Sequence, residues 1–340
     1  MSRTIIIAEA GVNHNGDINI AKRLVDAAAD AGVDYVKFQT FKADRLVSPS
    51  AQKAKYQIEN ETSNCDSQLN MLKKLELSDS DHKDLISYCK LKNINFFSTA
   101  FDEEGISYLS SLNFDMFKIP SGELTNYPYL RAIGKTNLPV ILSTGMANLN
   151  EIEKTINVLI SHGAKKNEIT VLHCNTEYPT PMTDVNLKAM LTIKDKLGVS
   201  IGYSDHTLGI EVPIAAVSMG AEVIEKHFTL SRNMTGPDHK ASLEPNELKE
   251  MVIAIRNIEI AISGNGIKEP SLSEKKNIYI ARKSIHLSKD LSSGSIITEK
   301  DIISLRPGDG ICTMNWMDII GKKVNKDLKK FTKLTLKDLS

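Results

Sequence analysis

Short apolar runs alternate with longer amphipathic stretches along residues 4–263. The runs are rich in β-branched and aromatic residues, which favours strands, and the longer stretches repeat apolar residues at helical spacing. The stretches 18–32 and 148–163 each end in glycine, which is typical of a helix C-terminus. The pattern predicts eight strands, at 4–11, 35–40, 95–101, 115–122, 139–145, 169–175, 200–206 and 222–228.

Strands that alternate with helices eight times predict an α/β protein with a (β/α)₈ barrel, the TIM barrel. A doubly wound open sheet is the alternative. No G-x-G-x-x-G turn follows the first strand, and polar residues end all eight strands and not only those at one crevice. The barrel is therefore the favoured fold.

The composition changes after residue 263. The segment 264–280 has the composition of a linker, and β-like runs punctuated by Gly and Pro follow it. We expect a catalytic barrel at 1–263, a linker at 264–280 and a small second domain at 281–340. Residues 41–77 form a polar connection that is too long for an ordinary loop after a strand, so this segment is a candidate lid.

Composition and charge exclude several classes of partner. The 340 residues carry 42 basic and 42 acidic side chains, so no overall basic field attracts nucleic acid or anionic lipid. The early apolar run "IIIA" is short and is interrupted by Glu9, so it predicts neither a signal peptide nor a membrane span. The four cysteines show no C-x-x-C spacing, which fits reduced thiols without a structural zinc site. We expect a cytoplasmic protein.

The active site of such a barrel lies at the C-terminal ends of its strands. Lys37 with Gln39, and Glu225 with His227, are two residues apart, so each pair points to one face of its strand. A lysine directed into a barrel is costly unless an anion meets it, although some such lysines extend to the rim. The polar strand-end residues are Glu9, Asn13, His14, Lys37, Gln39, Thr99, Lys118, Ser121, Glu123, Ser143, Thr176, Tyr178, Ser204, His206, Glu225 and His227.

Two histidines, His206 and His227, end neighbouring predicted strands. A lone inward histidine is more often a hydrogen-bonded structural residue. The pairing on the seventh and eighth strands, near carboxylates, favours a shared divalent cation. Imidazole ligands favour a transition metal, so we expect Mn²⁺, with Co²⁺ or Mg²⁺ as alternatives. The open coordination positions would allow the ion to act as a Lewis acid on a carbonyl.

Two short motifs place a hydroxyl residue and a glycine at a strand end, just before a helix. They are "KIPSGE" at 118–123 and "LSTGM" at 142–146. Free N–H groups, a hydroxyl and Lys118 can together hold a phosphate. Such turns are also ordinary loops of this fold, but the inward direction of Lys37 and Lys118 favours phosphate binding.

Eight motifs in order carry a resemblance to a known family: "AEAGVNHNGD", "VKFQTF", "FKIPSGE", "ILSTGM", "TEYPTP", "GYSDHT", "EKHFT" and "GPDHKASLEP". The sequence resembles the sialic acid synthase family, bacterial nonulosonic acid synthases that condense phosphoenolpyruvate with an N-acetylated mannosamine-type sugar. The resemblance extends over the whole chain. It implies an antifreeze-like domain (SAF, of the β-clip type) from "IARKSI" through "LRPGDGI".

The resemblance also implies roles for individual residues. It implies that His206 and His227 bind the metal, and that Arg306 reaches the active site of the partner subunit in a domain-swapped homodimer. Thr176 and Ala100 depart from residues common in the family, Asn and Pro, which affects fine positioning only. Phosphoenolpyruvate would contact Lys37, Thr99, Lys118, Ser121, Ser143 and Ser204. The amino sugar or the reacting centre would contact Glu9, Gln39, Glu123, Tyr178 and Asp238.

The implied reaction joins C3 of phosphoenolpyruvate to the aldehyde carbon of the open-chain sugar, which the bound cation polarises. Glu9 or Glu123 would stabilise the positive charge that develops at C2. Water then adds at C2, and phosphate leaves with C–O cleavage to give a nine-carbon 2-keto acid. Because His206 and His227 must be neutral to bind metal, activity should fall as the pH drops through their titration range.

Several alternatives stay open at this point. The preferred acceptor sugar is N-acetylmannosamine, which gives N-acetylneuraminate. The second candidate ranks nearly equal to it and is 2,4-diacetamido-2,4,6-trideoxymannose, which gives N,N'-diacetyllegionaminate. A Schiff-base aldolase that uses Lys37 or Lys118 as nucleophile has the same fold, but it leaves the two histidines unexplained. An ice-binding module is disfavoured because "SKDLSSGSIITEKD" is strongly charged.

Overall fold

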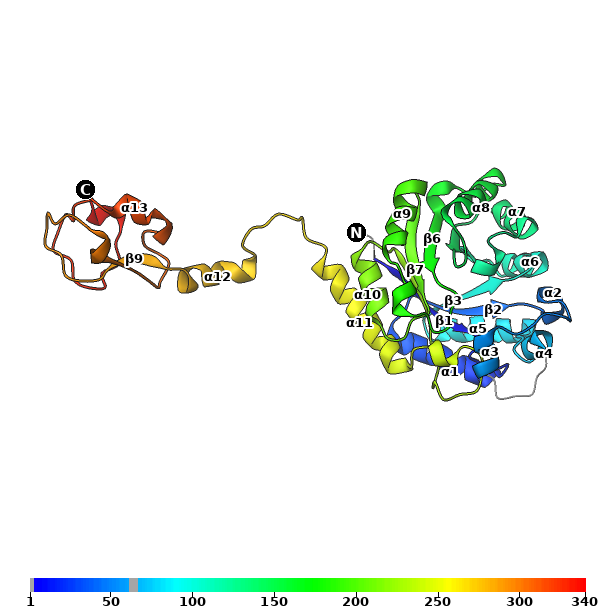
Figure 1. Cartoon of the computed structure of the whole chain (residues 1–340). Coiled ribbons are helices and arrows are strands. Elements are labelled where there is room, and N and C mark those ends of the chain that lie inside the picture. Colours follow the sequence, from blue (N-terminus) through cyan, green and yellow to red (C-terminus); the bar gives the residue numbers. More distant parts are fainter. Residues whose placement is uncertain (1–2, 61–66) are drawn as a thin grey trace. The chain divides into compact units, whose positions relative to one another are not determined.

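The computed structural model of the chain describes residues 3–60 and 67–340. The chain divides into two compact units, Met1–Gly264 and Asn265–Ser340, and each is described here by itself. Figure 1 shows the strands and helices of both units in sequence colours.

The first unit is a barrel of parallel strands, as the alternating pattern predicts. The strand order is β3-β2-β1-β8-β7-β6-β5-β4, and every ladder in this sheet is parallel. β3 and β4 adjoin at the seam without a ladder between them in the described part of the chain. The strands are β1 Ile5–Gly11, β2 Tyr35–Thr40, β3 Asn95–Ala100, β4 Phe117–Ile119, β5 Val140–Ser143, β6 Ile169–Cys174, β7 Ser200–Asp205 and β8 Val223–His227.

The barrel helices begin and end where the sequence provides caps. The Asp17 side chain accepts a hydrogen bond from the Asn19 N–H at the start of α1 (Ile18–Ala31), and Gly32 ends this helix with φ 79°. Asn148 and Glu151 form a capping box at the start of α8 (Leu149–Ser161). The other helices around the barrel are α5 Asp79–Leu91, α6 Glu103–Ser111, α7 Tyr127–Lys135, α9 Lys188–Leu197, α10 Glu211–Ser218 and α11 Pro245–Ala261.

The long connection after β2 contains three short helices, α2 Ala43–Leu46, α3 Lys55–Asn60 and α4 Gln68–Lys73. Its residues 61–66 lie outside the described part of the chain. The amide of Asn60 donates to the Pro237 carbonyl at 2.8 Å, so α3 contacts the loop that follows β8. Whether this segment moves as a lid stays a prediction.

The barrel interior has two layers. The lower layer is apolar and consists of Ile7, Phe97, Ile141, Leu172 and Val223, all buried. Side chains two residues further along a strand point to the same face. The upper layer therefore consists of the residues two positions further on, which are Glu9, Thr99, Ser143, Cys174 and Glu225. The strand period thus places polar groups directly above an apolar floor.

The second unit is small and has its own core. β9 (Ser284–Leu287) pairs with β10 (Ile302–Leu305) in an antiparallel ladder, and α13 spans Trp316–Ile319. Ile285, Leu287, Val324 and Leu334 lie in its core. The segment expected as a linker contains a helix, α12 (Leu272–Ala281), none of whose side chains is buried.

Two further sequence expectations concern membranes and cysteines. Among the described helices, none combines the length and apolar character required to cross a membrane. Cys89, Cys174 and Cys312 are free thiols, and Cys65 lies outside the described residues.

Gly202 in β7 sets how closely β7 and β8 approach each other. A Cβ at this position would lie 2.3 Å from the carbonyl oxygen of Val223, a backbone atom that cannot move without shifting β8. We predict that Gly202→Ala lowers the free energy of unfolding by about 1–3 kcal/mol, measured by urea unfolding followed by circular dichroism. Gly264→Ala is the control, because a Cβ there meets nothing within 4 Å. Equal unfolding midpoints for the two variants would contradict this interpretation.

Candidate active site

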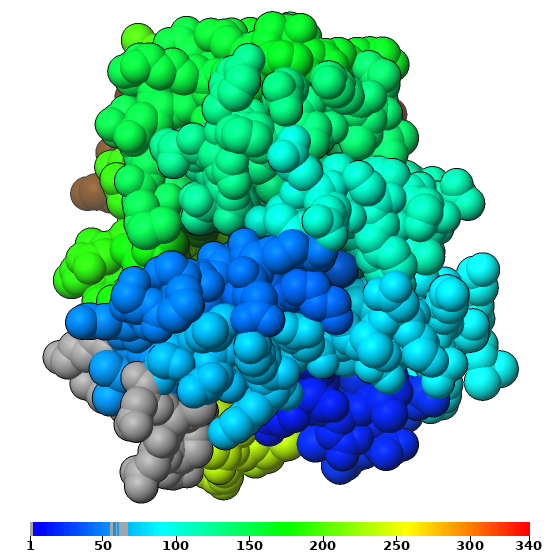
Figure 2. Space-filling model, turned by 90° about the vertical axis from the view of Figure 1, so that its right-hand side faces the viewer, coloured from blue at the N-terminus to red at the C-terminus, as the bar shows by residue number. Residues whose placement is uncertain are grey.

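A cavity of about 530 Å³ opens at the C-terminal ends of the barrel strands. Figure 2 shows one face of the barrel, where the blue residues of the connection after β2 lie beside the green residues of the β5 to β7 half. Glu225 lines the cavity together with thirteen of the predicted site residues. These thirteen are Glu9, Lys37, Gln39, Thr99, Lys118, Ser121, Ser143, Thr176, Tyr178, Ser204, His206, His227 and Asp238.

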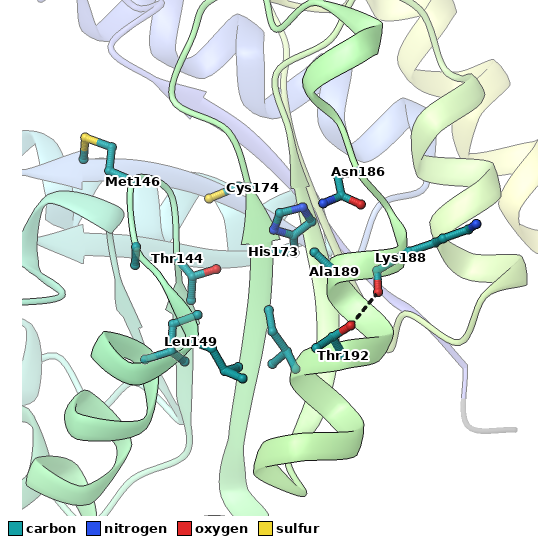
Figure 3. Close-up of a pocket in the computed structure, with 12 residues that line it drawn as sticks. Thr144, Met146, Leu149, His173, Cys174, Asn186, Lys188, Ala189 and Thr192 are labelled. Carbon is teal, nitrogen blue, oxygen red and sulfur yellow. Dashed lines mark hydrogen bonds between the residues drawn. The ribbon is translucent and has the colours of Figure 1, made fainter.

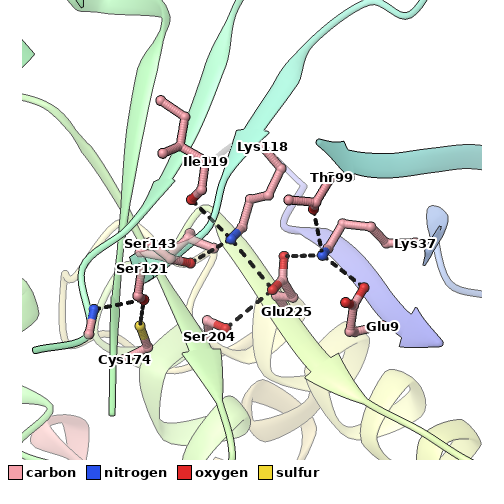
Figure 4. A network of polar contacts seen from close by, with 12 residues as sticks. Glu9, Lys37, Thr99, Lys118, Ile119, Ser121, Ser143, Cys174, Ser204 and Glu225 are labelled. Atoms are coloured by element: carbon pink, nitrogen blue, oxygen red, sulfur yellow. Dashed lines mark hydrogen bonds and ion pairs between the residues drawn. The ribbon is translucent and has the colours of Figure 1, made fainter. Parts of the chain in front are cut away.

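Lys37 on β2 is buried in the cavity floor and is held by groups from three other strands. Its Nζ lies 2.8 Å from Glu9 Oε2 and 3.7 Å from Glu225 Oε2. It also donates to Thr99 Oγ1 at 3.0 Å. Figure 4 shows this network from close by. The side chain extends into the barrel and does not reach the rim. The geometry therefore favours the prediction that Lys37 points inward.

Lys118 on β4 approaches the same carboxylate from the other side. Its Nζ donates to Ser143 Oγ at 2.6 Å and lies 3.7 Å from Glu225 Oε1. Ser204 Oγ donates to the same Glu225 oxygen at 3.3 Å. Glu225 therefore lies between two lysines, as Figure 4 shows. The sequence placed Glu225 among the strand-end residues but assigned it no role; the available signal was its position two residues before His227.

Burial and charge shift the pKa values of these four groups. Burial raises the pKa of Glu9 to about 7, against the opposing effect of Lys37. Burial acts against the charged form of Lys37, but Glu225 and Glu9 outweigh it and raise the pKa of this lysine. Burial lowers the pKa of Lys118, and Glu225 offsets this only in part. At Glu225, burial is outweighed by Lys118 and Lys37, so its pKa lies below the usual range.

The cavity floor is thus suited to an anion. It contains two lysines, one carboxylate that stays ionised and a second carboxyl group, Glu9, whose raised pKa leaves it only partly ionised at pH 7. Ser143 and Ser121 lie beside them, and Ser121 Oγ accepts a hydrogen bond from the Gly145 N–H at 2.9 Å. Lysines and hydroxyls of this kind form charge-assisted hydrogen bonds with phosphate or carboxylate oxygens.

His206 and His227 lie side by side on another part of the cavity wall. Their ring centroids are 5.4 Å apart, and Tyr178 stacks on His206 with centroids 4.1 Å apart. His206 Nδ1 is hydrogen-bonded to the Asn175 carbonyl, so Nδ1 carries the proton and Nε2 has the lone pair. Nε2 lies 3.0 Å from the Tyr178 hydroxyl. Within the described residues, His227 Nδ1 is buried without a hydrogen-bond partner, 3.9 Å from Asp238 Oδ2.

The donor set fits a divalent cation. Burial lowers the pKa of His206 to about 4. Burial, followed by the neighbouring His206, lowers the pKa of His227 well below its usual value. Both imidazoles are therefore in the neutral form that binds metals. The described residues contain no group of three or more His, Cys, Asp or Glu side chains placed to hold an ion. The protein would thus supply two nitrogens and leave the other positions to substrate or water.

Two predicted site residues are not brought into this cavity. Glu123, in the 3₁₀ turn Ser121–Glu123 after β4, does not line it, and instead accepts a hydrogen bond from the Asn126 amide at 2.6 Å. Arg306 belongs to the second unit, where it is exposed and donates from Nε to the Ala281 carbonyl at 3.0 Å. The roles assigned to both residues stay predictions.

The outer wall of the cavity comes from the connection after β2, and no sequence pattern predicted its individual residues. They line the cavity because α3 and α4 fold back over the strand ends. This wall carries no charged side chain among its described lining residues, which are Ala54, Gln57, Gln68, Met71, Leu72 and Leu75.

A second cavity of about 420 Å³ lies between β6, α8 and α9 (Figure 3). It shares Met146 and Cys174 with the first cavity. Its histidine, His173, is hydrogen-bonded through Nε2 to the Val185 carbonyl at 3.0 Å. No residue predicted for the active site lines this second cavity.

Fold and site together define a barrel enzyme with an anion-binding floor and a pair of neutral histidines at the strand ends. The NeuB family matches residues 24–268, and the SAF domain matches residues 282–340. The chain therefore belongs to the NeuB family, the sialic acid synthase family that the motifs indicate, and it is a phosphoenolpyruvate-condensing synthase. The antifreeze-like second domain is confirmed by the same comparison.

Three similar proteins locate the chain within the family. N,N'-diacetyllegionaminic acid synthase of Campylobacter jejuni is 54% identical over 97% of this chain and 98% of its own length. The enzyme of the same name from Legionella pneumophila is 47% identical over 97% of this chain and 92% of its own. The crystal structure of N-acetylneuraminic acid synthetase from Leptospira borgpetersenii, in complex with citrate, has a TM-score of 0.71 and 36% identity. It covers 82% of this chain and 90% of that one.

Glu225 compensates two buried lysines, so its removal should be costly. We predict that Glu225→Gln lowers the free energy of unfolding by about 3 kcal/mol in phosphate-free buffer, because the lysines lose a buried partner. Added phosphate should raise Tm more in this variant than in the wild type. Glu222→Gln is the control, because Glu222 directly precedes β8, away from the two lysines, and is half-buried. The measurement is thermal unfolding with and without phosphate, and an unchanged Tm for Glu225→Gln would show that the lysines do not depend on this carboxylate.

Proposed function

We propose that the protein condenses phosphoenolpyruvate with 2,4-diacetamido-2,4,6-trideoxymannose to give N,N'-diacetyllegionaminate and phosphate. The observation that carries this choice of acceptor is the 54% identity to the C. jejuni N,N'-diacetyllegionaminic acid synthase over nearly the whole of both chains. The sequence ranked N-acetylmannosamine narrowly first. The similarity to the N,N'-diacetyllegionaminic acid synthases instead favours 2,4-diacetamido-2,4,6-trideoxymannose.

The outer wall of the cavity supports the same acceptor. Met71, Leu72 and Leu75 offer apolar contacts, and Gln57 and Gln68 offer amide groups. A 6-deoxy sugar with two acetamido groups has a methyl group in place of a hydroxyl and two further methyl groups on its amides. Such a ligand gains from burial against apolar side chains, and its amides can form hydrogen bonds with the two glutamines.

The floor of the cavity would bind phosphoenolpyruvate. Lys37 and Lys118 would meet its phosphate and carboxylate, with hydroxyls of Ser143, Ser121, Thr99 and Ser204 as hydrogen-bond donors. The two ammonium groups would also stabilise the charge on the phosphate as it leaves. Their burial strengthens these interactions, because little water competes.

Glu9 is the group best placed to handle protons at the reacting carbon. Its pKa of about 7 suits a residue that takes a proton from the water adding at C2. Gln39 Nε2 lies 3.2 Å from Glu9 Oε1 and orients the carboxyl group. In its ionised form Glu9 would also stabilise positive charge at C2. Glu123 lies outside the cavity, so Glu9 is preferred over Glu123 for this role.

His206 and His227 would hold a divalent cation, with Mn²⁺ preferred over Co²⁺ and Mg²⁺. When bound, this ion supplies Lewis-acid polarisation of the sugar aldehyde. Tyr178 would fix the ring of His206 by stacking, and Asp238 would contact the sugar near His227. We further propose that the protein acts in the cytoplasm as a domain-swapped homodimer in which Arg306 completes the partner's site.

The proposal is tested by phosphate release from phosphoenolpyruvate, with Mn²⁺ or with EDTA, offering the two acceptor sugars in parallel. We expect release with the 2,4-diacetamido sugar to exceed release with N-acetylmannosamine, and EDTA to abolish both. A preference for N-acetylmannosamine would make the protein a sialic acid synthase. Release with neither sugar, together with borohydride trapping of pyruvate on Lys37 or Lys118, would instead establish the Schiff-base aldolase.

We predict that His227→Ala removes metal-dependent turnover while the barrel stays folded, because one of two protein ligands is lost. Circular dichroism reports the fold, and phosphate release reports turnover across a Mn²⁺ titration. His162→Ala is the matched control, since His162 lies at the end of α8, outside the cavity. Full activity of the wild type after chelation, or of His227→Ala at any Mn²⁺ concentration, would exclude the metal role.

A further inference from the structure

A buried ion pair lies on the outer face of β7 and β8, behind the two histidines. Asp205 and Lys226 are both 0% exposed, and Lys226 Nζ lies 2.5 Å from Asp205 Oδ2. Neighbouring side chains on a strand point to opposite faces. Asp205 therefore points away from the cavity that Ser204 faces, and Lys226 away from the cavity that Glu225 and His227 face. The proposed reaction uses neither residue of the pair.

The pair ties together the two backbone segments that carry the histidines. Asp205 lies opposite Lys226 in the register of β7 and β8. Lys226 Nζ also donates to the Thr207 carbonyl. The Asp205 carboxylate in turn accepts from the Thr207 N–H and from its hydroxyl, each at 3.0 Å. His206 thus lies between Asp205 and Thr207, and both of these residues are bonded to Lys226. Lys226 is the residue that directly precedes His227.

A second restraint acts at the other end of the same strand pair. Gly202 lies opposite Val223, and it allows the two backbones to approach more closely than any side chain would permit. The close approach at Gly202 and the ion pair at Asp205 together fix the position of β7 relative to β8 next to the two histidines. The two imidazole rings next to these restraints have centroids 5.4 Å apart.

Stability alone is a weak reason for such a pair. Buried ion pairs are often replaced by apolar residues of similar size without loss of stability, so their best-attested use is to fix one arrangement among several. Here the arrangement concerns two ring nitrogens that belong to different strands. A shared ion tolerates small errors in ligand position poorly, and residues behind the ligands commonly control affinity.

We infer that Asp205 and Lys226 form a positioning pair that holds His206 and His227 at the spacing required to bind one divalent cation. This inference rests on the cation-binding part of the proposed function. It does not depend on which acceptor sugar is used.

The test is the double variant Asp205→Asn/Lys226→Met, which removes both charges and leaves neither one unpaired. Mn²⁺ binding is measured by calorimetry, the d–d absorption of bound Co²⁺ reports ligand geometry, and thermal unfolding reports stability. We expect a Tm close to that of the wild type, an altered Co²⁺ spectrum, and Mn²⁺ affinity weakened by about 10-fold or more.

Arg256→Met is the matched control. Arg256 Nη2 lies 2.8 Å from Asp34 Oδ2, and Nη1 donates to the Thr4 carbonyl at 2.8 Å, so it too joins a carboxylate and a backbone carbonyl. This pair lies at the N-terminal ends of the strands, far along the barrel from the histidines. We expect Arg256→Met to lower Tm and to leave Mn²⁺ affinity unchanged.

The outcomes separate this inference from the proposed function. Wild-type Mn²⁺ affinity in the folded double variant would overturn the positioning role. If the double variant does not fold, Asp205→Asn alone is judged by the same criterion, since it keeps a hydrogen-bond acceptor for Lys226. A wild-type protein that binds neither Mn²⁺ nor Co²⁺ would overturn both the cation site and the inference. Weakened binding in the variant, with no phosphate release from phosphoenolpyruvate by the wild type in the presence of either sugar, would refute the proposed reaction and support the positioning pair.

Discussion

The burial of two lysines inside one barrel is the constraint on which the rest of the site depends. An ammonium group away from water is costly unless partners surround it. Lys37 and Lys118 find these partners only because strands distant in sequence end side by side, with Glu225 between the two lysines. The ring of strands and the apolar floor beneath them hold these partners in place.

The same constraint divides the cavity into two regions with different chemistry. The floor near β2, β4 and β5 carries two lysines against Glu225 and a Glu9 carboxyl group that is only partly ionised at pH 7. The wall at β7 and β8 presents two neutral imidazoles. A substrate anion on the floor and a cation on the wall would thus be brought close together without direct competition for ligands. This arrangement suits a condensation between an anionic donor and a carbonyl acceptor.

In the proposed reaction, selectivity for the acceptor and the chemistry depend on different parts of the chain. The charged groups of the floor and the two histidines lie on the strands or directly after them, where the barrel fixes their positions. The outer wall, whose described lining residues are uncharged, comes from the connection after β2 that contains the short helices α3 and α4. Enzymes of one fold vary most easily in such loops while the strand ends stay the same. Relatives of this chain named for different sugars are in keeping with that division.

The sequence by itself determined the eight strands, the helices between them and which strand-end residues share a face, since these depend on the local periods of two and 3.6 residues. It also determined the pairing of His206 with His227, because they end consecutive strands. Only the tertiary structure decided that Glu225 lies between two lysines, that Glu123 turns towards Asn126, and that Met71 and Leu72 line the cavity. These facts depend on contacts between residues far apart in the chain, and no local pattern encodes which distant side chain will meet which.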